Sequence, residues 1–157
     1  MELRKARIKE AQEIQQFING FAENGEVLPR SRADVYENIR DFFILKDNDG
    51  RLIATAALHI VWEDLAEIRS LLVDKSLRGG GHGRKLAQAC IDEARELGIQ
   101  QVFALTYSPG FFEKLGFHQA DKASLPHKIW ADCIHCPHFP DCNEVPVLLE
   151  VSPRSPD

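Results

Sequence analysis

Residues 74–85 of the chain read DKSLRGGGHGRK and follow a strand-like stretch from Ala66 to Val73. Four of the five residues from 79 to 83 are glycine. Such a density of glycine is costly unless the backbone adopts positive φ angles or another group approaches it closely. The loop leads directly into a helical pattern, and the N–H groups and dipole at a helix start attract phosphate. The pattern therefore predicts a strand–loop–helix unit whose loop is either an anion site or a flexible, solvated turn.

Two familiar phosphate motifs do not fit this loop. The spacing G-x-G-x-x-G of dinucleotide-binding folds is missing, and no Gly-Lys-Ser/Thr follows as in a Walker loop. Arg78, Arg84 and Lys85 add positive charge around the glycines.

Periodicity predicts the elements on either side of the loop. Ile14, Phe17, Ile18 and Phe21 recur at helical spacing. Further helices are expected at 33–42 and 109–115 and after the loop, where Leu86, Cys90, Ala94 and Leu97 mark a buried face and Gly98 a C-cap. Strands are expected at 3–8, 43–46, 52–60, 66–73, 101–105 and 145–151, with a hairpin turn at 47–50. This order predicts a mixed α/β sheet.

The 157 residues fit one domain, expected over 1–151, with a disordered tail at 152–157. The formal net charge of −5 disfavours nucleic-acid binding, which needs a basic face. The chain contains neither an apolar run near the roughly 20 residues of a membrane span nor a signal-peptide pattern. A cytoplasmic protein without a membrane partner is expected, and both a monomer and a homodimer stay open.

A cysteine-rich segment at 133–142 holds Cys133, Cys136 and Cys142 together with His135 and His138. Three thiols and an imidazole, with His138 as the imidazole ligand, are a donor set for structural zinc. A redox-sensitive thiol pair and reduced loop cysteines are the alternatives. A disulfide framework is not expected at this size.

The segment Arg78 to Gly83 matches the R/Q-x-x-G-x-G/A motif of GNAT acetyltransferases, and residues 111–117, FFEKLGF, resemble that family's F-Y-x-x-x-G-F segment. The resemblance implies the GNAT fold, an α/β (α+β) fold with a mixed, mostly antiparallel sheet of six to seven strands and about four helices. It implies acetyl-CoA as cosubstrate, with the diphosphate on the loop and the pantetheine along the preceding strand. The implied cofactor-binding residues are Leu71, Leu72, Val73, Arg78, Gly79, Gly80, Gly81, His82, Gly83, Arg84 and Phe112.

Glu67 resembles the strand glutamate that acts as general base in many GNAT enzymes, often through water, and an exposed strand carboxylate paired with Arg69 or a neighbour is the alternative. A backbone N–H near Leu72 is expected to stabilise the oxyanion. The family often has a tyrosine, the acid for the departing thiolate, where this chain has Phe112. Phenylalanine cannot donate a proton, so the acid is unassigned, with Tyr107 and Ser108 nearby.

A narrower resemblance is to the short, free-standing N-acetylglutamate synthases, which catalyse the first step of arginine biosynthesis. It rests on residues 25–31, 57–59 and 66–71 and on Leu105-Thr106. It implies L-glutamate as the amine. Because guanidinium groups bind carboxylates bidentately, Arg30 and Arg69 are the expected carboxylate ligands, with Lys128 closing the pocket. Each of these cations could instead be a surface charge.

Two other functions stay open on the sequence. One is acetylation of another small amine or of a protein amino group. The other is a non-catalytic module that senses acetyl-CoA or a metal. Phe112 in the position of the acid and the cysteine-rich segment are the features that favour it. His59 lies in an apolar strand, where a histidine satisfied in the core is the expected role.

Overall fold

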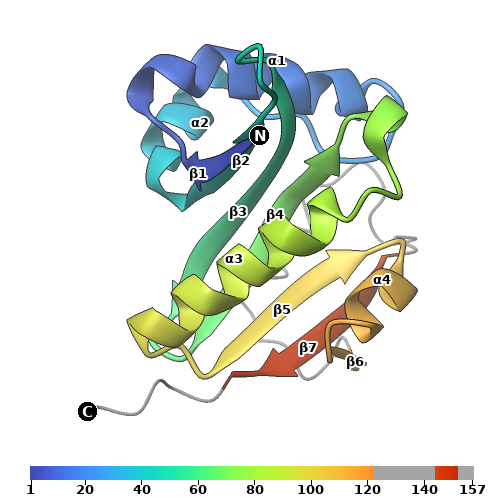
Figure 1. Cartoon of the computed structure of the whole chain (residues 1–157). Coiled ribbons are helices and arrows are strands. Elements are labelled where there is room, and N and C mark those ends of the chain that lie inside the picture. Colours follow the sequence, from blue (N-terminus) through green and yellow to red (C-terminus); the bar gives the residue numbers. More distant parts are fainter. Residues whose placement is uncertain (122–143, 152–157) are drawn as a thin grey trace. The chain divides into compact units, whose positions relative to one another are not determined.

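A computed structural model of the chain describes residues 1–121 and 144–151, and these form seven strands and four α-helices (Figure 1). In chain order the elements are β1 (Glu2–Lys5), α1 (Ala11–Ala22), α2 (Arg32–Glu37), β2 (Phe42–Lys46), β3 (Leu52–Trp62), β4 (Leu65–Val73), α3 (His82–Leu97), β5 (Gln101–Thr106), α4 (Pro109–Glu113), β6 (His118–Gln119) and β7 (Val145–Glu150). Three 3-10 turns accompany them: η1 (Ile8–Glu10), η2 (Ile39–Asp41) and η3 (Lys75–Leu77).

Neighbouring strands are hydrogen-bonded in the order β1-β2-β3-β4-β5-β7-β6. The pairs β1/β2, β2/β3, β5/β7 and β6/β7 are antiparallel, whereas β4 and β5 pair in parallel. The parallel pairing joins Leu65–Glu67 to residues 101–103. The predicted mixed, mostly antiparallel sheet is therefore confirmed.

The chain divides into two compact units. The first contains residues 1–59 and 68–90, and the second contains residues 60–67 and the described residues from 91 onward. Strand β4 contributes to both, because Leu65–Glu67 belongs to the second unit and Ile68–Val73 to the first.

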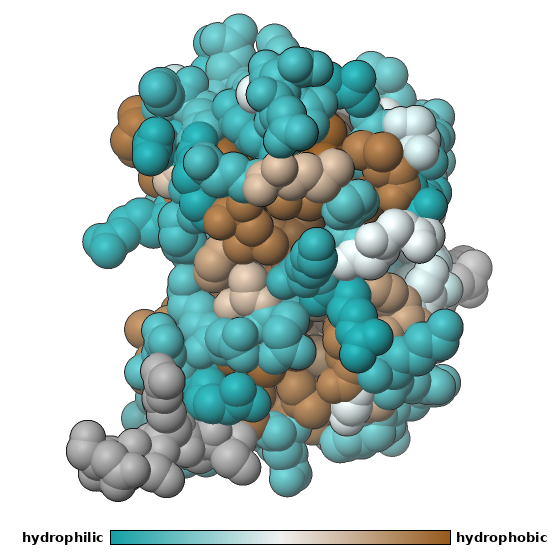
Figure 2. Space-filling view, viewed as in Figure 1, coloured by the Kyte–Doolittle hydropathy of each residue, from teal (hydrophilic) through white to brown (hydrophobic). Residues whose placement is uncertain are grey.

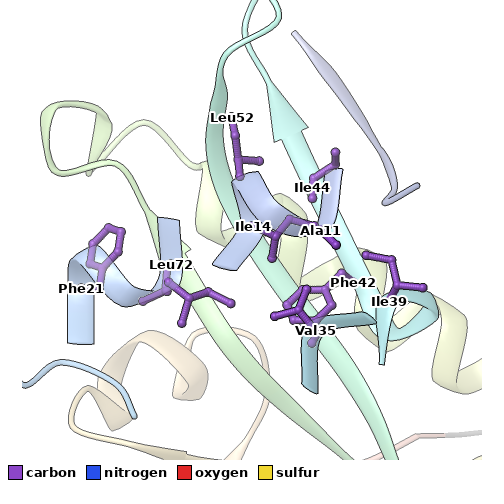
Figure 3. Close-up of a cluster of buried hydrophobic side chains, with 11 residues drawn as sticks. Ala11, Ile14, Phe21, Val35, Ile39, Phe42, Ile44, Leu52 and Leu72 are labelled. Carbon is purple, nitrogen blue, oxygen red and sulfur yellow. The ribbon is translucent and has the colours of Figure 1, made fainter. Parts of the chain in front are cut away.

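The core of the first unit lies between α1, α2 and strands β2 to β4 (Figure 3). Ala11, Ile14, Ile18 and Phe21 form the buried face of α1, as their spacing predicts. Twelve residues is near the length at which an isolated helix is marginal in water, so this packing, more than intrinsic propensity, holds α1 in place.

The second helix is shorter than the sequence pattern indicates. It ends at Glu37, where Asn38 donates from Nδ2 to the carbonyl of Asp34 at 2.9 Å. Phe42, expected on the helix, instead begins β2 and pairs with Ala57. The predicted helix over 33–42 is present only up to Glu37, and its C-terminal part was wrong, because Phe42 is buried as the first residue of a strand.

The C-terminal end of α3 also differs from the sequence prediction. Leu97 is 59% exposed, whereas Ile99 is buried and its N–H donates to the carbonyl of Ala94. Gly98, with φ of 82°, turns the chain so that Ile99 takes the apolar position. The predicted glycine C-cap is confirmed, and the prediction that Leu97 is buried was wrong.

In the second unit, β5 pairs with β7 along its whole length, and Phe103 and Leu65 form a small core. Helix α4 begins at Pro109, whose fixed φ suits the first turn, and it buries Phe112. Strand β6 was not predicted. Both of its residues are exposed, so the sequence shows no alternation of apolar and polar residues that would predict a strand there. The strand is defined by its pairing with Leu148 and Val147 of β7.

A charged cluster fixes the start of α1. Glu10 is 4% exposed, and Arg4 donates to both of its carboxylate oxygens, at 2.8 and 2.7 Å. Lys46 lies 2.9 Å from the same group. Hydrogen bonding to Arg4, followed by Lys46 and the backbone of Arg7, lowers the pKa of Glu10 to about 2.

This pKa predicts an acid-dependent loss of stability. The contribution of the Glu10 carboxylate is complete above its ordinary pKa of 4.5 and is lost as pH falls toward about 2. The difference corresponds to at most about 3 kcal/mol of unfolding free energy. Urea unfolding should show Glu10→Gln less stable at pH 7 by an amount of this order, with a flatter pH dependence below pH 4.5. Glu13→Gln is the control, because Glu13 is a 44% exposed partner of Lys46, and it should lower the unfolding free energy by less than about 1 kcal/mol. Equal losses of unfolding free energy in the two variants would contradict this account.

The face shown in Figure 2 is mainly hydrophilic, with hydrophobic patches between the polar side chains. Among the described residues, no helix is long and apolar enough to cross a membrane.

Candidate cofactor and substrate site

The glycine loop lies in the first unit, between β4 and α3. Asp74 starts it by accepting from the N–H and the hydroxyl of Ser76, at 3.0 and 2.7 Å, and these bonds, with Arg51, lower the pKa of Asp74. Gly79 and Gly81 have φ of 89° and 83°. A Cβ at either would meet nothing within 4 Å, so the backbone conformation, and not crowding by protein atoms, requires glycine there.

The loop ends as the start of a sixteen-residue helix. The carbonyl of Gly81 accepts the N–H of Lys85, so the amides of His82, Gly83 and Arg84 belong to the first turn, where N–H groups lack helical acceptors. The ring of His82 lies beside Gly80, whose added Cβ would be 3.2 Å from Nε2. Among the described residues, His82 Nδ1 is a buried side-chain atom without a hydrogen-bond partner. An anion cradle with an unsatisfied polar atom beside it fits a diphosphate.

Arg78 is tied to the segment after α1. Its guanidinium lies 3.1 Å from Glu26 and 5.8 Å from the ring centroid of Phe21. Arg78 is half exposed, so this ion pair contributes little stability. What it does is orient the guanidinium at the edge of the glycine loop.

Strand β4 changes direction just before the loop. Ser70 has φ of 52°, a left-handed conformation that costs a non-glycine residue about 1–2 kcal/mol. Thr55 of β3 donates from Oγ1 to the carbonyl of Ser70 at 2.8 Å. Leu72 packs into the core of the first unit, while Leu71 and Val73 are partly exposed. Nothing in the sequence indicated this kink, because serine is not a residue that usually marks positive φ.

Glu67 and Arg69 lie on β4 in different units. Glu67, 8% exposed, pairs with Phe103 in the second unit, and Arg69 is partly buried in the first. The Glu67 side chain is therefore a buried acidic group on β4, as the Glu10 side chain is at the start of α1.

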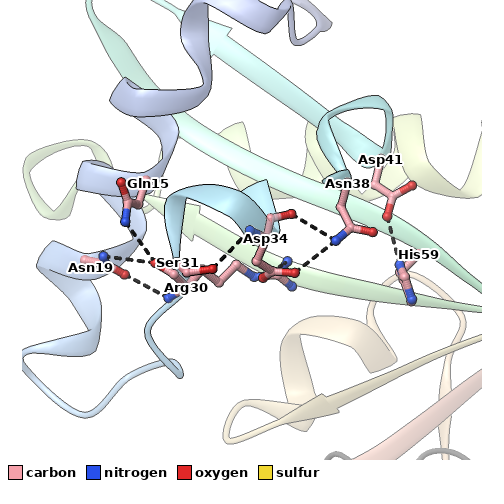
Figure 4. Close-up of polar contacts among 8 residues, drawn as sticks. All are labelled: Gln15, Asn19, Arg30, Ser31, Asp34, Asn38, Asp41 and His59. Atoms are coloured by element: carbon pink, nitrogen blue, oxygen red, sulfur yellow. Dashed lines mark hydrogen bonds and ion pairs between the residues drawn. The ribbon is translucent and has the colours of Figure 1, made fainter. Parts of the chain in front are cut away.

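The backbone of Arg30 is held by two side chains of α1 (Figure 4). Asn19 accepts from the N–H of Arg30 at 3.0 Å and donates to its carbonyl at 3.2 Å, and Gln15 donates to the same carbonyl. The side chain is 14% exposed, lies 3.2 Å from Asp34, and stacks over the ring of Phe42 at 5.6 Å. Both the main chain and the guanidinium are therefore fixed.

His59 has a polar partner, as expected, but it does not lie in the core. Its side chain is 31% exposed, and Nδ1 lies 2.8 Å from the carboxylate of Asp41 (Figure 4). The partner follows α2 by a few residues, so the two groups meet only through the fold.

Phe112 is buried in the second unit, packed edge-to-face against Phe111 and Phe117 with ring centroids 5.1 Å apart in each pair. Tyr107, one of the alternatives for the acid, is 49% exposed. Ser108, the other, donates its backbone N–H to the hydroxyl of Thr106.

Several predicted residues lie outside the described residues: Lys128, Cys133, Cys136, His138, Cys142 and the tail 152–157. Within 1–121 and 144–151, no cluster of three or more His, Cys, Asp or Glu side chains could hold a metal ion. Cys90, on α3, is buried.

The model of the acetyltransferase (GNAT) family matches residues 8–117. The chain belongs to the GNAT acetyltransferase family. The matched residues include the glycine loop, Glu67, Arg30, Arg69 and Phe112. The GNAT resemblance drawn from Arg78 to Gly83 is thereby confirmed.

Relatives of this GNAT chain point in the same direction. It is 38% identical to an uncharacterized N-acetyltransferase of Chlorobaculum tepidum, covering 93% of this chain and 94% of the relative. It is 32% identical to an amino-acid acetyltransferase of Mycobacterium tuberculosis, over 82% of this chain and 74% of the relative. The crystal structure of N-acetylglutamate synthase from Neisseria gonorrhoeae, complexed with coenzyme A and N-acetyl-glutamate, superposes with a TM-score of 0.86 at 30% identity, over 96% of this chain and 35% of that one. The GNAT chain is an acetyl-CoA-dependent N-acetyltransferase.

Proposed function

We propose that the chain transfers the acetyl group of acetyl-CoA to the α-amino group of L-glutamate, the first step of arginine biosynthesis, in the cytoplasm. The observation that carries the choice of amine is Arg30. Its backbone is held by Asn19, and its guanidinium lies over Phe42 and 3.2 Å from Asp34, whose carboxylate a substrate carboxylate would replace or join. A dicarboxylate needs such preorganised cations, because ordering a long side chain on binding weakens affinity. The relatives named amino-acid acetyltransferases support the same choice.

The diphosphate of acetyl-CoA would bind the loop from Arg78 to Arg84. Gly79 and Gly81 let the backbone approach it, and the first-turn amides of α3 supply N–H donors. The pantetheine would follow Leu71, Leu72 and Val73, in the part of β4 beyond Glu67, where the pairing with β5 ends. Phe112 has no proton to donate, so it is not proposed as the acid.

Glu67 would accept a proton from the substrate ammonium group, directly or through water, to give the neutral amine. The amine nitrogen then bonds to the thioester carbonyl carbon and the carbon–sulfur bond breaks. Coenzyme A leaves as the thiolate, and the second proton of the nitrogen passes to that thiolate or to water, which leaves the neutral amide. A backbone N–H at Leu71 or Leu72 would stabilise the negative charge that develops on the carbonyl oxygen. Since an ordinary thiol has a pKa near ~8.5, the thiolate can leave without a strong acid.

The direct test is thiol release from acetyl-CoA in the presence of a panel of amines. Glutamate should give the highest kcat/KM, with N-acetylglutamate as the product by mass spectrometry. Faster release with a monocarboxylate, a polyamine or a peptide would replace glutamate as the substrate. Binding of acetyl-CoA without release by any amine would indicate a sensor.

Arg30→Ala is expected to raise the KM for glutamate by about 10–100-fold with little change in the KM for acetyl-CoA. The estimate follows from the roughly 1.5–3 kcal/mol of a charged hydrogen bond. Arg32→Ala is the matched control, since Arg32 is an exposed arginine two residues away at the start of α2. Steady-state kinetics would count against the assignment if the two variants had the same glutamate KM. Arg69→Ala should raise the KM for glutamate in the same way, because glutamate has two carboxylates and each needs a cationic partner.

A further inference from the structure

Thr55 is the one polar side chain in the buried stretch of β3 from Leu52 to Leu58. Its exposed fraction is 0%, so its hydroxyl must be satisfied inside the protein. The hydroxyl donates to the carbonyl of Ser70 at 2.8 Å. Threonine at this position thus makes a contact that an isosteric valine could not make.

The residue that receives this bond is strained. Among the described residues, Ser70 is the one non-glycine residue with positive φ. A left-handed serine persists only when its surroundings determine it, and such residues cluster at functional sites. The bond from Thr55 is a specific interaction, across two strands of the first unit, that favours this conformation.

The bond also fixes the next amide. Because a trans peptide unit is planar, the N–H of Leu71 points opposite to the carbonyl of Ser70. Holding that carbonyl toward Thr55 therefore directs the N–H of Leu71 away from β3. A donor that must meet a developing oxyanion needs this kind of fixed direction before the reaction begins.

We propose that Thr55 is a positioning residue for acetyl transfer, which acts by clamping the Ser70 carbonyl so that the N–H of Leu71 faces the thioester carbonyl. The inference rests on the proposed course of acetyl-CoA along Leu71–Val73. Thr55 itself touches neither substrate, and its effect passes through one peptide plane.

The test compares Thr55→Val with Thr55→Ser. Valine keeps the shape and removes the donor, and it should lower kcat by about 10–100-fold, the effect of a small misplacement of a reacting group. Serine keeps the donor and should stay within about threefold of the wild-type kcat, as expected if the hydroxyl and not the methyl carries the effect. The KM for acetyl-CoA should change little, since the loop contacts are intact. A wild-type kcat in Thr55→Val, or equal losses in both variants, would overturn the proposal.

An infrared measurement separates positioning from folding. Acetyl-CoA carrying 13C at the thioester carbonyl should show a lower carbonyl stretching frequency when bound to the wild type, because a hydrogen bond weakens the C=O bond. In Thr55→Val the frequency should rise, and an unchanged frequency would count against the clamp. This readout needs no amine, so it stands even if glutamate is not the substrate, and failure of the wild type to bind acetyl-CoA would instead refute the proposed cofactor site.

Should Thr55→Val not fold, Ser70 gives a second route. Asparagine tolerates a left-handed conformation and a β-branched valine does not. Ser70→Asn should therefore keep most of the kcat and Ser70→Val should lose about as much as Thr55→Val. Equal rates in the two Ser70 variants would show that the conformation of this residue does not position the reaction.

Discussion

Glu67→Gln is expected to lower kcat for acetyl transfer by about 10²–10⁴-fold at neutral pH, the range that a general base contributes. Glutamine keeps the size of a side chain that is 8% exposed, so packing should be retained. An α-amino group is largely protonated at neutral pH and cannot attack a thioester until it loses a proton. Removing the acceptor of that proton therefore affects kcat far more than the binding of either substrate.

The pH profile distinguishes this role from a structural one. As pH rises, more of the substrate amine is already neutral in solution, so the deficit of Glu67→Gln should shrink. Glu63→Gln, at an exposed glutamate in the turn between β3 and β4, serves as the control and should follow the wild type. Thiol-release kinetics at several pH values make the comparison. A constant deficit at every pH, or none, would remove Glu67 from the role of base.

The second large effect concerns the glycine loop. The double variant Gly79→Val/Gly81→Val should raise the Kd for acetyl-CoA by about 30–1000-fold. A side chain at a φ above 80° is unfavourable by about 1–2 kcal/mol, so the free loop of the variant should relax to another conformation at each position. Returning the loop to the binding conformation then costs this energy, and every 1.4 kcal/mol is a factor of ten in affinity. The new side chains would also extend into the open space where the diphosphate is proposed to lie.

Gly50→Val is a closely matched control for this variant. Gly50 lies in the turn between β2 and β3, has φ of 80°, and also has open space at its Cβ. It should lose stability as each loop substitution does, yet bind acetyl-CoA like the wild type. Calorimetric titration with acetyl-CoA decides between them. If Gly50→Val and the loop variant showed the same Kd, the loop would not be the diphosphate site.

Local chemistry alone predicted much of the fold. The spacing of Ile14, Ile18 and Phe21 placed α1, and Gly98 marked the end of α3, because these signals act within one or two turns of chain. The same holds for the hairpin turn at 47–50, which the register of β2 with β3 confirms. Where the pattern was wrong, contacts outside the local repeat decided: Phe42 is buried in β2, paired with Ala57 of β3, and Ile99, two residues after Leu97, takes the buried position at the end of α3.

For the candidate site, too, local sequence signals and long-range contacts determined different features. By itself the sequence located the glycine-rich loop and predicted the family, because glycine density, a helix start and motif spacing are properties of consecutive residues. Only the tertiary structure decided that Asn19 holds Arg30, that His59 meets Asp41, and that Thr55 clamps the left-handed Ser70. These contacts join residues 11 to 18 positions apart, and the chain brings such partners together only when strands pair and helices pack.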